Sequence, residues 1–210
     1  MATMSMNTVI HAAVRRDLGR LERALDDLAP GDTARAAELA RAWAHFREQL
    51  DHHHRSEHEV VWPALTSWGV DPALLAQMDA EHDLMAAALA DADAAVGTLR
   101  GDASPRSRDH AREAVRRLHR VTADHLEHEE RELEPLLLGG FEGSPEAAEM
   151  DRRLRAGGLG RAAVLMSWLA DGAGPRESQA LRELVPAPFR VLLIGVMGRG
   201  YRREVASVWR

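Results

Sequence analysis

One pattern of histidine, glutamate and proline occurs twice in this chain, as His-x3-Glu-x5-Pro beginning at His53 and again at His125. One more histidine precedes each copy, at 42 residues before His53 and 43 residues before His125. This repetition gives four imidazoles and two carboxylates, which together are a ligand set for a pair of metal ions. The candidate metal ligands are His11, His53, Glu57, His82, His125 and Glu129.

Residues four apart lie on one face of an α-helix, so His53 and Glu57 can approach one ion together, as can His125 and Glu129. A single histidine in a core is usually a hydrogen-bonded structural group. Six polar groups at one depth of a core are different, because each unpartnered group costs on the order of 2–7 kcal/mol to bury. Metal ions remove that cost, and a metal-free polar network is the alternative.

The composition favours helices to position these ligands, since Ala, Leu, Arg and Glu are abundant and strand formers are few. Apolar residues recur at spacings of three and four, and the candidate ligands continue the same stripes. Short connections between the helices favour antiparallel neighbours, so we predict an all-α fold, an up-down-up-down four-helix bundle around a di-metal centre. The expected helices cover residues 7–29, 33–68, 72–100 and 105–138.

The same periodicity separates the candidate ligands from the other seven histidines. His54 leaves the stripe that His53 continues, and we expect surface or peripheral positions for the seven. Glu132 is one further candidate near the metals, although a solvated carboxylate at the end of the bundle is the favoured interpretation. The seven histidines are His45, His52, His54, His58, His110, His119 and His128.

The chain has no cysteine, so disulfides, thiolate zinc sites and iron–sulfur clusters are excluded and any metal must be held by nitrogen and oxygen. Imidazole and carboxylate suit iron, with zinc or manganese as alternatives. If each glutamate bridges two ions, each ion has two histidines, two carboxylate oxygens and a shared oxo or hydroxo group. About one coordination position per ion then stays open.

The two His-x3-Glu copies, with Trp62-Pro63 behind the first and Glu81-His82 ahead of the second, resemble the hemerythrin-like HHE cation-binding domain family over roughly residues 7–138. The resemblance implies a four-helix bundle around two iron ions. It also implies that the four histidines are terminal ligands and that the two glutamates are bridges. A small diatomic ligand (O2 or NO) or peroxide would bind at an open iron position.

The chain departs from the oxygen-carrying hemerythrins at two places. Those proteins have a second histidine four residues from the ligand of the third helix, where this chain has Met78 and Ala86. They also use an aspartate as the second bridge, where this chain has Glu129. We therefore expect oxygen, nitrosative or oxidative stress response or sensing in place of oxygen transport. The alternative is a di-iron enzyme with peroxidase, catalase-like or oxygenase activity.

The chain divides, on this interpretation, into a bundle of residues 1–140 and a helical extension of residues 141–210. Residues 189–197 are apolar nearly all round, so we expect them to be buried against the bundle, or in a homodimer formed through the extension. Binding to a membrane surface is a third, less favoured alternative. Tyr201 is expected to be a core or interface anchor.

The net charge of −6 argues against nucleic acid as a partner. The N-terminal residues lack the basic and apolar regions of a signal peptide. The most apolar stretch is too short to span a bilayer. A cytoplasmic protein with no membrane partner is expected.

Overall fold

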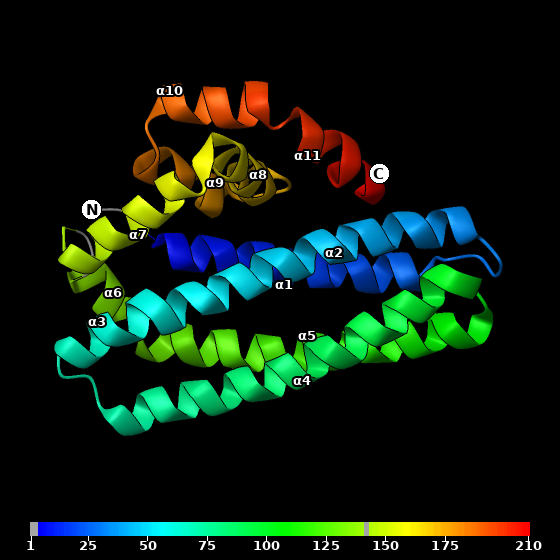
Figure 1. Cartoon of the computed structure of the whole chain (residues 1–210), viewed down its shortest axis with the longest axis horizontal. Coiled ribbons are helices and arrows are strands. Elements are labelled where there is room, and N and C mark those ends of the chain that lie inside the picture. The colour runs from blue at the N-terminus through cyan, green and yellow to red at the C-terminus, as the bar shows by residue number, and fades with distance from the viewer. Residues whose placement is uncertain (1–3, 141–142) are drawn as a thin grey trace.

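The computed structural model describes residues 4–140 and 143–210, and within these residues the regular structure is helical without strands. The predicted all-α class is therefore confirmed. Four long helices form the body of the molecule (Figure 1). Their bounds are Met6–Asp26 for α1, Thr33–Ser56 for α2, Pro72–Asp102 for α4 and Pro105–Glu132 for α5.

Side-chain caps define where the long helices begin. Ser5 accepts a hydrogen bond from the backbone N–H of Thr8 at the start of α1, and Asp32 does the same for Arg35 at the start of α2. Helices α4 and α5 begin with a proline, which has no N–H to leave unsatisfied in a first turn. These starts agree with the sequence prediction.

Successive long helices run in opposite directions, and the α1–α2 and α4–α5 connections meet at one end of the bundle (Figure 1). Helix α1 packs against α2 and α5, and α4 packs against α2 and α5. This arrangement closes a ring of four helices around one apolar core. Leu18, Phe46, Met85 and Leu118 supply one fully buried side chain from each helix.

The proline of the first repeat changes the helix around Glu57. Helix α2 continues without interruption into a π-helical turn, η1 (Glu57–Val61), and then into α3 (Trp62–Ser67). Pro63 has no N–H to donate to the carbonyl four residues earlier, and the N–H of Trp62 instead reaches the carbonyl of Glu57, five residues earlier. The candidate ligand Glu57 therefore begins a widened turn.

The proline of the second repeat ends a helix. Helix α5 stops at Glu132, Leu133 intervenes, and α6 (Glu134–Gly140) begins in a new direction. The sequence predicted an unbroken helix to residue 138, which is wrong because Pro135 cannot continue the hydrogen-bond ladder of α5. The two copies of the sequence pattern thus have different backbones after the glutamate.

The residues after 142 form short helices that lie over α1 and α2 (Figure 1). The helical stretch from Pro145 to Ala170 is divided at Gly157 and Gly158, where Gly158 adopts a φ of 79° that favours glycine. The bounds are Pro145–Ala156 for α7, Gly158–Ala170 for α8, Pro175–Leu184 for α9, Ala187–Arg190 for α10, Val191–Met197 for η2, Arg199–Glu204 for α11 and Ala206–Trp209 for η3.

Trp168 anchors these C-terminal helices on the bundle. Its side chain is fully buried, and its indole N–H donates a 2.7 Å hydrogen bond to the buried carboxylate of Asp17 on α1. Residues of α8, α9 and α11 belong to the same apolar core as the bundle. The extension therefore packs on the bundle, while its division from residues 1–140 as a separate domain stays a prediction.

The apolar segment near the C-terminus is more exposed than the sequence predicted. Only Leu193 of η2 is buried, and the expectation that the whole segment packs against the bundle is wrong. Within the described residues, no helix is both long and apolar enough to cross a bilayer. The large exposed apolar residues here are Phe189, Val191, Leu192, Val196 and Met197.

Candidate metal centre

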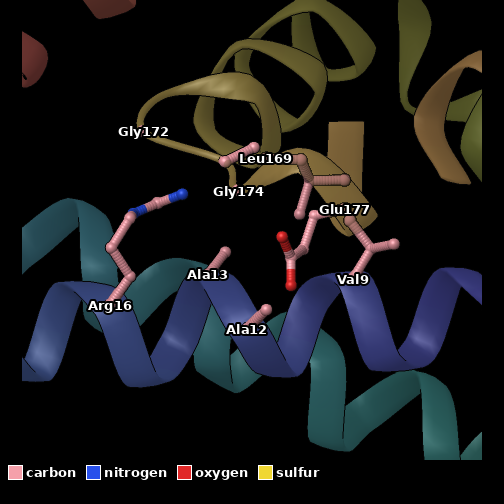
Figure 2. Close-up of a pocket in the computed structure, with 9 residues that line it drawn as sticks. Val9, Ala12, Ala13, Arg16, Leu169, Gly172, Gly174 and Glu177 are labelled. Carbon is pink, nitrogen blue, oxygen red and sulfur yellow. The ribbon is translucent and has the colours of Figure 1, made fainter. Parts of the chain in front are cut away.

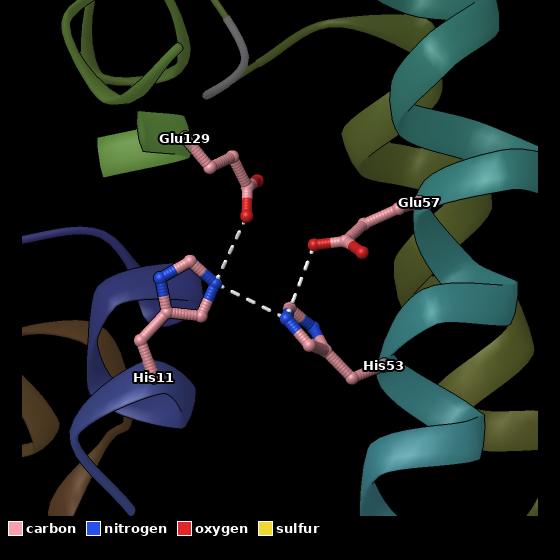
Figure 3. Close-up of side chains that lie close together, drawn as sticks. All are labelled: His11, His53, Glu57 and Glu129. Atoms are coloured by element: carbon pink, nitrogen blue, oxygen red, sulfur yellow. Dashed lines mark hydrogen bonds and ion pairs between the residues drawn. The ribbon is translucent and has the colours of Figure 1, made fainter. Parts of the chain in front are cut away.

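The six residues selected from the sequence gather in the interior of the bundle, although they come from four helices. Each is at most 6% exposed. Helix α1 supplies one histidine, α2 and η1 supply His53 and Glu57, α4 supplies one histidine, and α5 supplies His125 and Glu129. Figure 3 shows four of them, with the imidazoles and carboxylates turned toward one another.

The first group of donors lies between α1, α2 and α5. The Nε2 atoms of His11 and His53 are 3.1 Å apart. An oxygen of Glu57 lies 3.1 Å from Nε2 of His53, and an oxygen of Glu129 lies 3.2 Å from Nε2 of His11 (Figure 3). Two nitrogens bound at right angles to one ion at about 2.1 Å would be roughly 3.0 Å apart, which is close to the observed spacing.

The second group of donors lies between α4 and α5. The Nε2 atoms of His82 and His125 are 3.0 Å apart. The other oxygen of Glu57 lies 3.4 Å from Nε2 of His82. The oxygen of Glu129 that faces His11 is also 3.8 Å from Nε2 of His125. Each carboxylate therefore faces both histidine pairs, which is the placement that a bridging ligand requires.

The buried glutamates have opposite pKa shifts. Burial and the nearby charge of Glu129 raise the pKa of Glu57 well above its ordinary value. Burial would also raise the pKa of Glu129, but the charge of His11, with help from His125 and a hydrogen bond from Asn7, lowers that pKa to about 2. The two carboxylates thus resist carrying negative charge together unless cations are added.

Burial and neighbouring charges also shift the pKa values of three histidines in the cluster. Burial would lower the pKa of His11, but Glu129 and Glu130 outweigh it and raise that pKa. Burial and the neighbouring imidazoles lower the pKa of His53 well below its ordinary value. Burial, with the charges of His125 and His58, lowers the pKa of His82 to about 4. The lowered pKa values of His53 and His82 favour their neutral forms, in which a ring nitrogen has a lone pair that can bind a metal.

Three buried carboxylate oxygens without hydrogen-bond donors indicate whether these residues fit a metal. Both carboxylate oxygens of Glu57 and one of Glu129 are buried and accept no hydrogen bond. Buried carboxylate oxygens without donors are costly, and metal ions would satisfy all three. The donor set, made only of nitrogen and oxygen, therefore fits a pair of ions better than a closed hydrogen-bond network.

Carboxylates behind the imidazoles orient two of the rings. Nδ1 of His11 lies 3.0 Å from Glu130, which is also bound by Arg15, and Nδ1 of His125 lies 2.9 Å from Glu81. A proton held on Nδ1 in this way leaves Nε2 free for an ion, and metal sites use such pairs regularly. Glu130 follows Glu129 in the sequence and was not predicted to have this role; its side chain is 28% exposed.

Further side chains complete the surroundings. Nδ1 of His82 lies 3.2 Å from His58, and the indole of Trp62 stacks on His82 with the ring planes 3° apart. The amide of Asn7 donates a 2.9 Å hydrogen bond to the second oxygen of Glu129. Trp62 itself donates to Asp79. The candidate ligands are thus enclosed by packed and hydrogen-bonded neighbours.

Four of the seven peripheral histidines occupy informative positions. His128 shares Glu81 with His125, and His58 contacts His82, so both are near the cluster as expected. His54 differs from expectation, because its Nε2 is buried inside the cluster. His45 is not solvated either, and its ring packs on Trp168 and Tyr201.

Two other residues are placed away from the cluster. Glu132 is exposed and pairs with Arg131, in agreement with the solvated interpretation. Tyr201 is buried and donates a hydrogen bond to Asp171 on the C-terminal side of α8, so it anchors the extension. Neither residue belongs to the candidate metal centre.

A separate surface pocket of about 280 Å³ lies between α1 and the α8–α9 connection (Figure 2). Arg16 and Glu177 project into it from opposite sides, beside Val9 and Leu169. None of the six candidate ligands lines this pocket. It is therefore distinct from the buried cluster.

The fold and the cluster define a helical-bundle protein with a buried histidine and glutamate site of metal-binding character. The model of the family described as Hemerythrin HHE cation binding domain matches residues 8–137, a range that contains all six candidate ligands. The chain therefore belongs to the hemerythrin HHE cation-binding family. No curated protein and no solved structure matches it.

Proposed function

We propose that this chain holds two iron ions in its bundle and binds a small ligand, such as O2, NO or peroxide, in an oxygen, nitrosative or oxidative stress response. The ligands proposed are His11, His53, Glu57, His82, His125 and Glu129. The observation that carries this proposal is the position of Glu57, whose two unpartnered oxygens face different histidine pairs.

Family membership and the donor set together favour iron. Imidazole and carboxylate ligands with no thiolate suit iron, and they leave zinc and manganese as alternatives. Iron would supply redox chemistry and an exchangeable coordination position for the small ligand. The packed side chains around the cluster would keep bulk water away from that position.

The protein's own residues would prepare the site. Glu130 and Glu81 would hold protons on Nδ1 of His11 and His125, so that both Nε2 atoms stay available. The π-helical turn that begins at Glu57 would set the direction of its carboxylate between the two histidine pairs. These features need no movement of the helices.

Iron loading tests the proposal directly. Metal-free protein is titrated anaerobically with Fe(II) and bound iron is counted. Spectra are then recorded after exposure to air and after addition of NO or peroxide. We expect two irons per chain and new visible bands that depend on the added ligand. The matched control is Glu132→Gln, an exposed carboxylate that should change neither result.

Well under two irons per chain, or two irons with no spectral response to O2, NO or peroxide, would count against the proposal. Equal uptake of zinc with no preference for iron in cells would point to a metal store. Steady turnover of peroxide, or substrate-dependent oxygen uptake, would instead assign the chain to the alternative class of di-iron enzymes.

A further inference from the structure

His54 belongs to the buried cluster, although the helical pattern selected only its neighbour His53. It stands next to His53, and residues adjacent in a helix point in directions about 100° apart. Helix α2 lies between α1 and α4, so this divergence lets His53 face His11 while His54 faces His82. One helix can therefore direct an imidazole to each metal position.

The Nε2 atom of His54 is buried and has no hydrogen-bond partner. One donor atom each from His54, Glu57 and His82 lie within 4.8 Å of one another. A buried imidazole with an unpartnered nitrogen, beside a carboxylate and a second imidazole, has the surroundings of a metal ligand.

The rings have the spacing of imidazoles around one ion. The centroids of His54 and His82 are 4.4 Å apart, those of His82 and His125 are 4.5 Å apart, and those of His54 and His125 are 6.3 Å apart. With metal–nitrogen bonds of about 2.1 Å, adjacent imidazoles have centroids roughly 4.6 Å apart and opposite imidazoles roughly 6.5 Å apart. The three distances match two adjacent pairs and one opposite pair.

From this geometry we propose that His54 is a third imidazole ligand of the ion held by His82 and His125. The inference rests on the proposed di-iron function, which it deepens. It gives the centre five histidines, with the fifth coming from α2 because Met78 and Ala86 occupy the positions where α4 lacks one. The proposal also gives the two ions different numbers of imidazoles. In the second repeat the residue after His125 is Leu126, so the second repeat has no counterpart of His54.

On this assignment the ion at His82 and His125 would have three imidazoles, whereas the ion at His11 and His53 would have two.

Three variants separate coordination from packing. His54→Gln removes the imidazole, and His54→Phe keeps a flat ring against His82 without a nitrogen. The control is His52→Gln, which changes the half-exposed histidine two residues away that contacts Arg161. Each purified protein is first checked for helicity by circular dichroism and then titrated with Co(II) and with Fe(II).

Two measurements decide the proposal. Ring N–H protons of metal-bound imidazoles give strongly shifted, solvent-exchangeable NMR signals in the Co(II) protein, and we expect five such signals in the parent chain and four in both His54 variants. We also expect the second Co(II) to bind at least about tenfold more weakly in both variants, because even residues behind the ligands change metal affinity by about 10–100-fold. His52→Gln should behave as the parent chain.

Four signals in the parent chain, or full metal affinity in His54→Phe, would overturn the assignment of His54 and leave the two-ion centre intact. Fewer than two ions bound by the parent chain would instead overturn the proposed function, and this inference with it. The two failures are therefore distinguishable in one titration.

Discussion

The carboxylate of Glu81, on α4, accepts a 2.9 Å hydrogen bond from Nδ1 of His125, on α5. This contact joins two helices behind the candidate metal centre and turns Nε2 of His125 toward Nε2 of His82. The ring of a candidate ligand is thus oriented by a residue that is not itself a candidate ligand.

We predict that Glu81→Gln weakens metal binding by about 10–100-fold, because a neutral amide no longer favours the proton on Nδ1 of His125. Competitive titration against a chelator of known affinity measures this change. Asp83→Asn, an exposed change two residues away on α4, is the control and should bind metal as the parent chain does. Equal affinities for the two variants would show that Glu81 has no part in the centre.

Glu57→Gln tests the bridging position. An amide is a poor bridge, so we expect fewer than two ions per chain and a smaller metal-dependent increase in stability. In the parent chain that increase is about 2.7 kcal/mol for each bound ion when free metal is 100 times its dissociation constant. Urea denaturation with and without metal measures it. The metal-free variant should unfold at a similar urea concentration, since the parent carboxyl has no donor to lose. Two ions and the full increase in the variant would contradict a bridging role.

Trp168→Phe tests how the C-terminal helices are held. The change leaves one buried oxygen of Asp17 without its indole donor, so we expect a loss of about 1–3 kcal/mol in the free energy of unfolding. Metal content should not change. Leu159→Ala, at a side chain 57% exposed on the same helix, should change stability by less than about 0.5 kcal/mol. A Trp168→Phe protein as stable as the parent would mean that this contact does not anchor the extension.

The buried position of His45 leads us to predict how the stability of the metal-free protein changes as the pH falls. Burial lowers the pKa of His45 below its ordinary 6.5, and the charged groups around it are Asp17, Glu48 and Arg16. As the pH falls below about 6.5 the unfolded chain takes up this proton first, so the stability contribution of His45 is complete above that pH and is lost below it.

The variant for this prediction is His45→Phe, which keeps a ring against Trp168 and Tyr201 but cannot titrate. We expect its free energy of unfolding to fall less steeply than that of the parent between about pH 7.5 and pH 5. The exposed change His110→Gln is the control. Parallel pH profiles for His45→Phe and the parent chain would contradict the prediction.

The helical class and the convergence of the six selected residues could be predicted because both follow from local periodicity. A ligand that continues an apolar stripe must face the core of a bundle, whichever way the helices are connected. The doubled His-x3-Glu pattern therefore indicated the interior location of His53, Glu57, His125 and Glu129 before any tertiary contact was known. Their role as ligands stays a proposal.

Other features depended on how the helices pack. His54 lies outside the stripe of α2, and only the position of α4 beside α2 brings its Nε2 to His82. Glu81 contacts the ring of His125 because α4 packs against α5, and Glu130 contacts the ring of His11 because α5 packs against α1. The two prolines have different effects on the backbone before them: a π-helical turn precedes Pro63, whereas helix α5 ends three residues before Pro135. A proline removes the same hydrogen bond in both places, so the surrounding contacts decide the outcome.

The amino-acid sequence by itself determined that this protein is helical, that it lacks sulfur ligands other than methionine, and that six histidines and glutamates share one interior level. Only the tertiary structure decided which oxygens of Glu57 and Glu129 face which imidazoles, that His54 joins them, and that the residues after 142 cover α1 and α2. The physical reason is that periodicity specifies the face of a single helix, whereas distances between side chains of different helices depend on the packing of all four.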